Sequence, residues 1–187
     1  TFFSIFKIIG YRNASNLGEK IGRTVGPIFR SSHIVLKNFE NLNDSYSQNE
    51  IKNIIKNMWG NYGRIFAEYM YLKKFRNDIL SSNIEINGQK ILDEIKSKKE
   101  PVIFVSGHFN NFELMAMHLE KSGINLAAIY RPLNNKFLNP LMEKIRKNYI
   151  CRKQIKKGIG GTKEILKYFK KGTSIALMID QRVSEGI

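Results

Sequence analysis

The stretch VIFVSGHFNNFE, residues 102–113, indicates both the fold of this chain and its candidate site. The apolar run at 102–105 predicts a buried strand, and the Ser-Gly pair after it predicts a turn. A helical pattern starts between His108 and Glu113, so both residues lie where a strand passes into a helix. An imidazole beside a carboxylate can accept a proton from a hydroxyl near neutral pH. We therefore expect a general base at this strand end.

The pattern around this stretch predicts alternating strands and helices. Apolar runs predict strands, at 83–86, 102–105, 125–130 and 173–179, with a short one around 149–151. Helical spacing of apolar residues predicts helices, at 50–72, 89–97, 110–121, 134–148 and 162–170. Such alternation predicts an α/β fold with a largely parallel sheet flanked by helices and preceded by an N-terminal helical region. We expect a membrane-proximal helical segment at 1–48 and an α/β domain at 49–187 that is truncated at its C-terminal end.

Two apolar helical faces allow two interpretations each. Residues 1–9 carry six apolar side chains, too few for a spanning helix, which needs about 20. They form either an amphipathic segment on a membrane or a helix packed on the core. The one-sided stripe of 50–72 is either a core face or a face that meets lipid or an acyl chain.

Charge and cysteine content restrict the classes of partner and cofactor. There are 31 Lys and Arg against 16 Asp and Glu, a net charge of +15. Such a chain favours nucleic acid, acidic proteins, phosphorylated lipids or anionic membrane. Cys151 is the single cysteine, so no internal disulfide forms, and one Cys with three scattered His provides no metal site. We expect neither a metal nor another cofactor.

Three chemically active residue types follow successive predicted strands. His108 follows the strand at 102–105, Arg131 the strand at 125–130, and Asp180 with Gln181 the strand at 173–179. The carboxyl ends of parallel strands share one edge of a sheet, where active sites gather. These residues also have structural interpretations. Glu113 stands three residues after Asn110, the spacing of a capping box, and His108 would be a polar residue within a turn. Arg131 would be a solvated turn residue, and Asp180 an N-cap or an ion-pair partner.

The basic residues concentrate beside this predicted edge. Residues 136–171 hold twelve Lys and Arg against two Glu, a net +10. This segment suits an acidic protein or a phosphate-bearing substrate, or it is a solvated lysine-rich face. Three glycines within 156–164 precede a helix start and could present free amides to a phosphate, although they match no known phosphate-loop pattern.

Several blocks together resemble the late acyltransferases of lipid A biosynthesis, the lauroyl and myristoyl transferase family. SGHFNNFE at 106–113 resembles their HxxxxE signature, and YRPLNN at 130–135 looks like their second block. The region of Arg146, GTKEILKYFKKG and IALMIDQ resemble later blocks in the same order, and RSSHIVLKNFENL and WGNYGRIFAE resemble the helical lead-in. Asn110 stands where that family usually has Gly, and Phe112 where it usually has Trp.

The resemblance implies an enzyme on the cytoplasmic face of the bacterial inner membrane. It would transfer a fatty acyl group from acyl carrier protein to a hydroxyl of a phosphorylated lipid A precursor. The implied catalytic pair is His108 as general base, oriented by Glu113. The implied substrate-binding residues are Arg131, Asn111, Asn135, Asp180 and Gln181. The basic segment 136–171 would meet the carrier protein and the phosphates of the glycolipid, at an anionic membrane surface.

Two rival functions remain at this stage. A nucleic-acid-binding module would also explain the charge, but the chain has no nucleic-acid-reading motif and its aromatic residues lie mostly on apolar helical faces. An acyltransferase of the same chemistry that acts on another lipid acceptor is the second rival.

Overall fold

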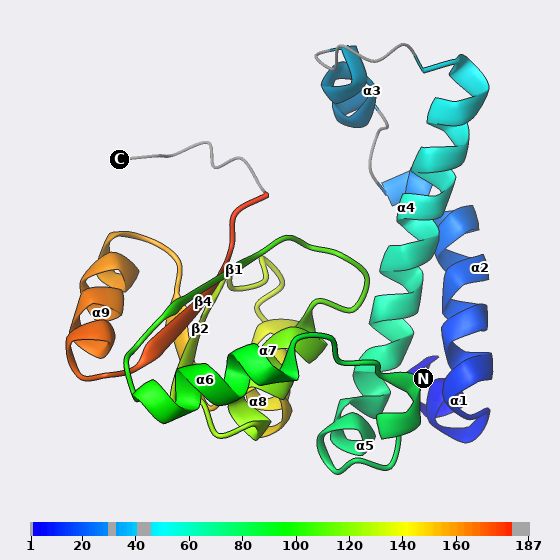
Figure 1. Ribbon diagram of the computed structural model, residues 1–187. Coiled ribbons are helices and arrows are strands. Elements are labelled where there is room, and N and C mark those ends of the chain that lie inside the picture. The colour runs from blue at the N-terminus through cyan, green and yellow to red at the C-terminus, as the bar shows by residue number, and fades with distance from the viewer. Residues whose placement is uncertain (1, 30–32, 41–45, 181–187) are drawn as a thin grey trace. The chain divides into compact units, whose positions relative to one another are not determined.

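The computed structural model describes residues 2–29, 33–40 and 46–180, which form a mixed α/β fold (Figure 1). The chain divides into two compact units, Thr1–Tyr71 and Leu72–Ile187, which are described separately. The predicted fold class is confirmed: a parallel sheet flanked by helices follows an N-terminal helical region. The division between compact units comes after Tyr71, whereas the sequence placed the start of the α/β domain at residue 49.

The described part of the first unit is helical. Its elements are α1 (Phe2–Ile8), α2 (Tyr11–Phe29), α3 (His33–Glu40), α4 (Gln48–Glu68) and a 3-10 turn at Tyr69–Tyr71. The start of α4 is fixed by a capping box, in which the Ser47 hydroxyl accepts the Glu50 amide and the Glu50 carboxylate accepts the Ser47 amide. No helix within the described ranges is long and apolar enough to cross a membrane.

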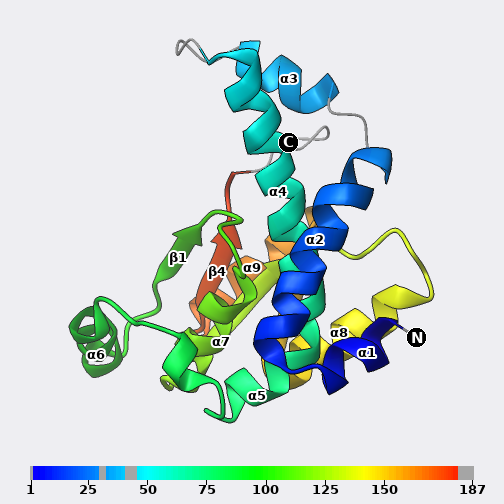
Figure 2. The same ribbon diagram turned by 90° about the vertical axis from the view of Figure 1, so that its right-hand side faces the viewer.

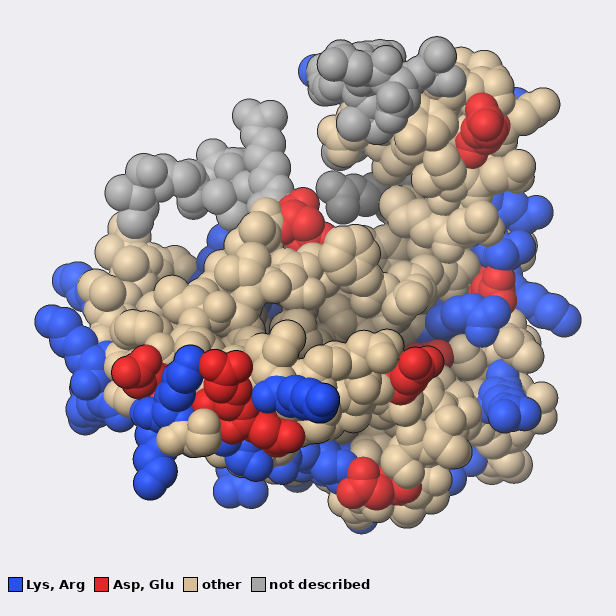
Figure 3. All heavy atoms as spheres, in the orientation of Figure 1, with Lys and Arg blue, Asp and Glu red and all other residues tan. Residues whose placement is uncertain are grey.

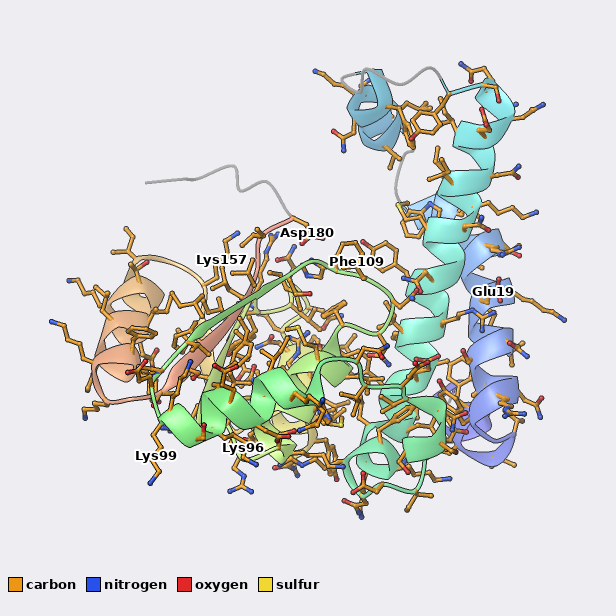
Figure 4. All side chains as sticks on the ribbon, viewed as in Figure 1. Glu19, Lys96, Lys99, Phe109, Lys157 and Asp180 are labelled. Carbon is orange, nitrogen blue, oxygen red and sulfur yellow. The ribbon has the colours of Figure 1, made fainter. Side chains whose placement is uncertain are left out.

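Helices α2 and α4 pack with their backbones in direct contact. A Cβ on Gly63 would overlap the Gly18 carbonyl oxygen, and a Cβ on Gly22 would overlap the Trp59 carbonyl oxygen. Small residues are therefore needed along this seam. Polar side chains complete it: Glu68 accepts a 2.7 Å hydrogen bond from the Ser15 hydroxyl, and Glu19 of α2, labelled in Figure 4, pairs with Arg64 of α4.

The second unit holds the sheet. Its elements are α5 (Leu72–Arg76), a 3-10 turn (Ser81–Asn83), α6 (Gln89–Lys98), β1 (Ile103–Ser106), α7 (Glu113–Lys121), β2 (Leu126–Tyr130), α8 (Leu138–Tyr149), β3 (Lys153–Lys156), α9 (Ile159–Lys170) and β4 (Ser174–Met178). The strands are all parallel, in the order β1-β4-β2-β3. Figure 2 shows β1 and β4 running side by side.

Each face of the sheet has its own helical cover. On one face Ala127, Ile155 and Ile175 form a fully buried cluster against which the apolar side of α9 packs. Helices α7 and α8 contact β2 and β3, and α7 buries Ala116 and Met117. Two covered faces explain why the central strands read as continuous apolar runs.

Three local predictions were wrong. Residues 83–86 form no strand, because the segment has no neighbouring strand to supply backbone hydrogen bonds. The strand at 102–105 was predicted to be buried, but β1 is an edge strand whose Ile103 and Val105 are exposed. The short strand expected around 149–151 forms instead at Lys153–Lys156. Apolar runs reveal a strand but not its place in the sheet.

Replacing Gly63 by Ala should force α2 and α4 apart, because the added methyl would overlap the backbone of Gly18. We expect a loss of about 2 kcal/mol in the free energy of unfolding of this unit. Thermal unfolding followed by the fluorescence of Trp59, which packs against Gly26 in the same seam, measures it. Gly160→Ala is the matched control, since nothing lies within 4 Å of its Cβ position. Equal midpoints for the two variants would refute the close-packed seam.

Candidate active site

The turn that follows β1 has an unusual backbone. Asn110 adopts a φ of +42°, in the left-handed region that favours glycine and that Asn tolerates better than other side chains. This explains how Asn serves at a position where the resembling family usually has Gly. The Asn110 carbonyl then accepts the amide of Phe112, one residue before α7 begins.

His108 is held at two points by one carboxylate. Asp180 Oδ1 lies 2.7 Å from the ring Nδ1, and Asp180 Oδ2 accepts the backbone amide of His108 at 2.7 Å. The ring of Phe112 meets the imidazole edge-on, with ring centroids 4.6 Å apart. The ring is about one-quarter exposed. Because a carboxylate accepts the Nδ1 proton, Nε2 of the neutral ring is left with a free lone pair.

The hydrogen bonds from His108 change the pKa of the Asp180 carboxyl. The pKa of Asp180 is lowered, chiefly by the hydrogen bond from the backbone amide of His108; burial opposes this effect, and the imidazole hydrogen bond adds to it. Asp180 is therefore ionised throughout the neutral range, and an ionised neighbour stabilises the imidazolium that forms when the ring accepts a second proton.

A cavity of about 230 Å³ opens beside the ring. Its apolar wall includes Ala128 and Ala176, which are direct neighbours on β2 and β4. Two small side chains in register leave this space open. Polar groups enter it from several elements: His108, Glu113, Tyr130, Arg131, Arg146, Gln154 and Lys157.

Glu113 and His108 both line the cavity, but the expected pairing between them is replaced by two other pairs. Glu113, the first residue of α7, accepts hydrogen bonds at 2.9 and 2.8 Å from Nε and a terminal nitrogen of Arg146 on α8. The Glu113 side chain is nearly buried, and the guanidinium balances its charge. The acid that contacts the ring is Asp180, 72 residues away, which the sequence placed at the same sheet edge but did not pair with His108.

A second polar network extends the wall of the cavity. The Tyr130 hydroxyl donates to Glu143 at 2.8 Å, and Asn139 donates to the same oxygen at 2.8 Å. Burial, together with the Glu143 hydrogen bond, raises the pKa of Tyr130 to about 12, so its hydroxyl stays protonated. The Arg146 guanidinium lies 5.9 Å from the Tyr130 ring centroid and so links this network to Glu113.

The other predicted site residues are placed differently. Arg131 is exposed and lines the cavity. Asn135 accepts the amides of Phe137 and Leu138 on its side-chain oxygen, which fixes the chain just before α8. Asn111 lies in the turn before α7, and Gln181 lies outside the described residues. Their assignment to substrate binding stays a prediction.

The sequence gave no warning of the parts played by Arg146 and Tyr130. Arg146 was noted only as part of a resembling block, and Tyr130 as the end of a strand and the start of another such block. For Tyr130, the signal was its place at the carboxyl end of a parallel strand.

Thiol and metal chemistry find no support among the described residues. Cys151 is fully buried, and its pKa is raised to about 11, chiefly by burial. Its thiolate, the nucleophilic form, is therefore scarce at neutral pH. Within the part of the chain that the structure describes, no group of three or more His, Cys, Asp or Glu could hold a metal ion.

Fold and site together define a class of protein: a parallel α/β domain that presents a carboxylate-bound imidazole to a partly apolar cavity, as general-base group transfer requires. The chain belongs to the bacterial lipid A biosynthesis acyltransferases, whose family model matches residues 1–186. The resemblance predicted from the sequence blocks is thereby confirmed, and the family is one of acyltransferases. No curated protein sequence matches the chain.

Substitutions at Asn110 should test the left-handed turn. Asn110→Val should cost about 1 to 2 kcal/mol in the free energy of unfolding, because a β-branched side chain is strained at a φ of +42°. Asn110→Gly should stay within about 0.5 kcal/mol of the parent chain. Urea unfolding measures both, and equal losses for Val and Gly would contradict the turn.

Asp180→Asn should reduce stability in a pH-dependent way. Since the folded pKa of Asp180 is lowered, its contribution is fully present above about pH 4, where the unfolded carboxyl is ionised, and is lost as pH falls through the folded pKa. The difference in urea midpoint between parent and variant should therefore shrink as the pH is lowered from about 6 to about 3. A difference that stays constant over this range would contradict the contact.

Proposed function

We propose that this acyltransferase moves a fatty acyl group from the thioester of acyl carrier protein to a hydroxyl of a lipid A precursor, with His108 as the general base. The observation that carries the proposal is the His108–Asp180 contact at the mouth of the cavity. Family membership supplies the reaction class, and the geometry supplies a base with a defined free nitrogen.

The chemical step needs a base because an alcohol is far too weak an acid to ionise near neutral pH. As the acceptor oxygen forms a bond to the thioester carbon, its proton passes to Nε2 of His108. Asp180 holds Nδ1–H and stabilises the resulting imidazolium, as the acid does in a hydrolase triad. Asp180 is thus a positioning residue, the part that the sequence had given to Glu113.

Collapse of the tetrahedral intermediate completes the transfer. Its oxyanion needs hydrogen-bond donors in a partly desolvated place, and Arg131 is the candidate because it lines the cavity from the end of β2. The carbon–sulfur bond then breaks, and the departing thiolate takes the proton from the imidazolium. The products are the ester and the free thiol of the carrier protein. No acyl-enzyme is needed.

Glu113 has a different part in this scheme. Glu113 forms an ion pair with Arg146, so the guanidinium lies in the cavity wall with its charge balanced. Breaking such a pair by removing one partner leaves the other charge uncompensated, so Glu113 is needed even though Asp180 orients the ring. Its carboxylate also lines the same cavity as the imidazole.

The charges suit an acidic donor and a phosphorylated acceptor. Arg131 and Lys157 also line the cavity, and Glu113, the one carboxylate among its described lining residues, is paired with Arg146. Figure 3 shows Lys and Arg gathered over α9 and mixed with Asp and Glu over α6, and the basic surface of α9 fits acyl carrier protein through charge complementarity. We place the enzyme at the cytoplasmic face of the inner membrane, where both substrates of such a reaction meet.

His108→Ala should lower kcat for acyl transfer by roughly 10² to 10⁴, the usual contribution of a general base. Mass spectrometry of the glycolipid after incubation with acyl carrier protein measures the transfer. The matched control is His118→Gln, because His118 lies on α7 and bonds Ser122 instead of lining the cavity. Unchanged transfer by His108→Ala would refute the mechanism.

Asp180 and Glu113 can be separated in the same assay. Asp180→Asn should lower kcat roughly 10²-fold with little change in KM, because the ring loses its orientation and its counter-charge. Asp180→Glu should recover part of the loss. A larger effect of Glu113→Gln on kcat at an unchanged KM, with Asp180→Asn near parent activity, would return the orienting role to Glu113.

A further inference from the structure

An exposed apolar side chain follows each strand of the sheet, in the loop after β1, β2 and β4 and as the first residue of α9 after β3. Phe109 follows β1, Phe137 follows β2, Ile159 follows β3 and Ile179 follows β4. Their exposed fractions are 76%, 93%, 72% and 64%. The four side chains are called here the apolar rim. Isolated exposed apolar residues are ordinary in soluble proteins, but one on every strand end of a single sheet is a pattern.

The topology brings the apolar rim to one edge. All four strands are parallel, so their carboxyl ends lie together. With strands about 4.8 Å apart, the loops span roughly 15 to 20 Å. The cavity of His108 opens at this same edge, and Figure 4 shows Phe109, Asp180 and Lys157 along it. The apolar rim therefore borders the entrance to the proposed site.

Cations accompany the apolar rim on the same loops. Arg131 and Lys136 are exposed between β2 and α8, Lys156 is exposed at the end of β3, and Lys157 is exposed between β3 and α9. Of the described carboxylates near them, Asp180 holds His108, Glu143 accepts from Tyr130 and lies 3.8 Å from Lys156, and Glu164 lines a surface pocket together with Lys156 and Lys157. Exposed aromatic and aliphatic tips flanked by Lys and Arg have the composition of a surface that enters the headgroup layer of an anionic bilayer.

We propose that the apolar rim is a lipid-contact surface that places the mouth of the cavity against an anionic membrane. This inference rests on the proposed function, since it explains how a lipid-borne hydroxyl reaches His108 while its own acyl chains stay in the bilayer. Phe137 is the deepest-inserting residue, because it is the most exposed of the four and has Lys136 beside it. Anionic headgroups meet the four cations.

A fluorescent reporter tests the contact directly. Phe137→Cys labelled with an environment-sensitive dye should show a blue shift and an intensity rise of about threefold on addition of vesicles of phosphatidylethanolamine and phosphatidylglycerol. The native thiol does not compete for the label, because Cys151 is fully buried. Ile91→Cys on α6 is the matched control, since Ile91 is 63% exposed but lies outside the apolar rim. Equal responses, or none at position 137, would overturn the proposal.

A second pair of variants separates membrane contact from catalysis. Phe137→Ser with Ile159→Ser should weaken co-sedimentation with the same vesicles about tenfold and should lower transfer to vesicle-embedded acceptor. Transfer to detergent-dispersed acceptor should be kept, since neither residue lines the cavity. Ile79→Ser with Ile91→Ser is the control, on two exposed residues away from the strand ends.

The outcomes for the two proposals differ. Unchanged vesicle binding by Phe137→Ser with Ile159→Ser would sink the lipid-contact surface and leave the acyl-transfer mechanism standing. A parent chain that binds vesicles through the apolar rim but transfers no acyl group in detergent would do the reverse. A dye response to acyl carrier protein in place of vesicles would assign the apolar rim to a protein partner and overturn the proposal.

Discussion

The parallel pairing of β1 with β4 is the constraint on which the candidate site depends. Its register aligns Ser106 with Met178, the last residues of the two strands. His108 and Asp180 each lie two residues beyond these ends. The Ile179 amide extends the ladder by bonding the Ser106 carbonyl at 3.0 Å. Backbone hydrogen bonds, spaced by the strand repeat, thus set the separation of an imidazole and a carboxylate that are 72 residues apart. A one-residue slip of either strand would turn one side chain to the opposite face.

The chemistry of the cavity follows from what surrounds that contact. Ala128 and Ala176, paired in register, leave room for the cavity. The ion pair of Glu113 with Arg146 lies in its wall. Tyr130, whose hydroxyl donates a hydrogen bond to Glu143, lines another side. Glu113, Arg146 and Tyr130 are held by hydrogen bonds within the protein, whereas the His108 ring is bonded at Nδ1 and keeps Nε2 for the proposed proton transfer. The apolar rim lies at the same edge, because the loops that follow the carboxyl ends of parallel strands lie together.

Much of this architecture was predictable. Apolar periodicity predicted the helices α4, α6, α7, α8 and α9 and the strands β1, β2 and β4 to within a few residues, because burial imposes the 3.6 and 2.0 periods directly on the sequence. It failed at 83–86, where a short apolar run meets no neighbouring strand, and at β1, where an apolar run proved to be an edge. Partner strands are a property of the folded chain, and no local window contains them.

The sequence by itself determined the α/β class, the acyltransferase family and the gathering of His108, Arg131 and Asp180 at the strand ends, since composition, periodicity and ordered motifs are local quantities. Only the tertiary structure decided which acid holds the imidazole. In the HxxxxE motif, Glu113 is the acid nearest to His108 along the chain. In the fold, strand register brings Asp180 to His108, and helix packing brings Arg146 to Glu113. Two residues close in sequence lose little conformational entropy when they come into contact. The hydrogen-bond geometry across the sheet decides which contacts actually form.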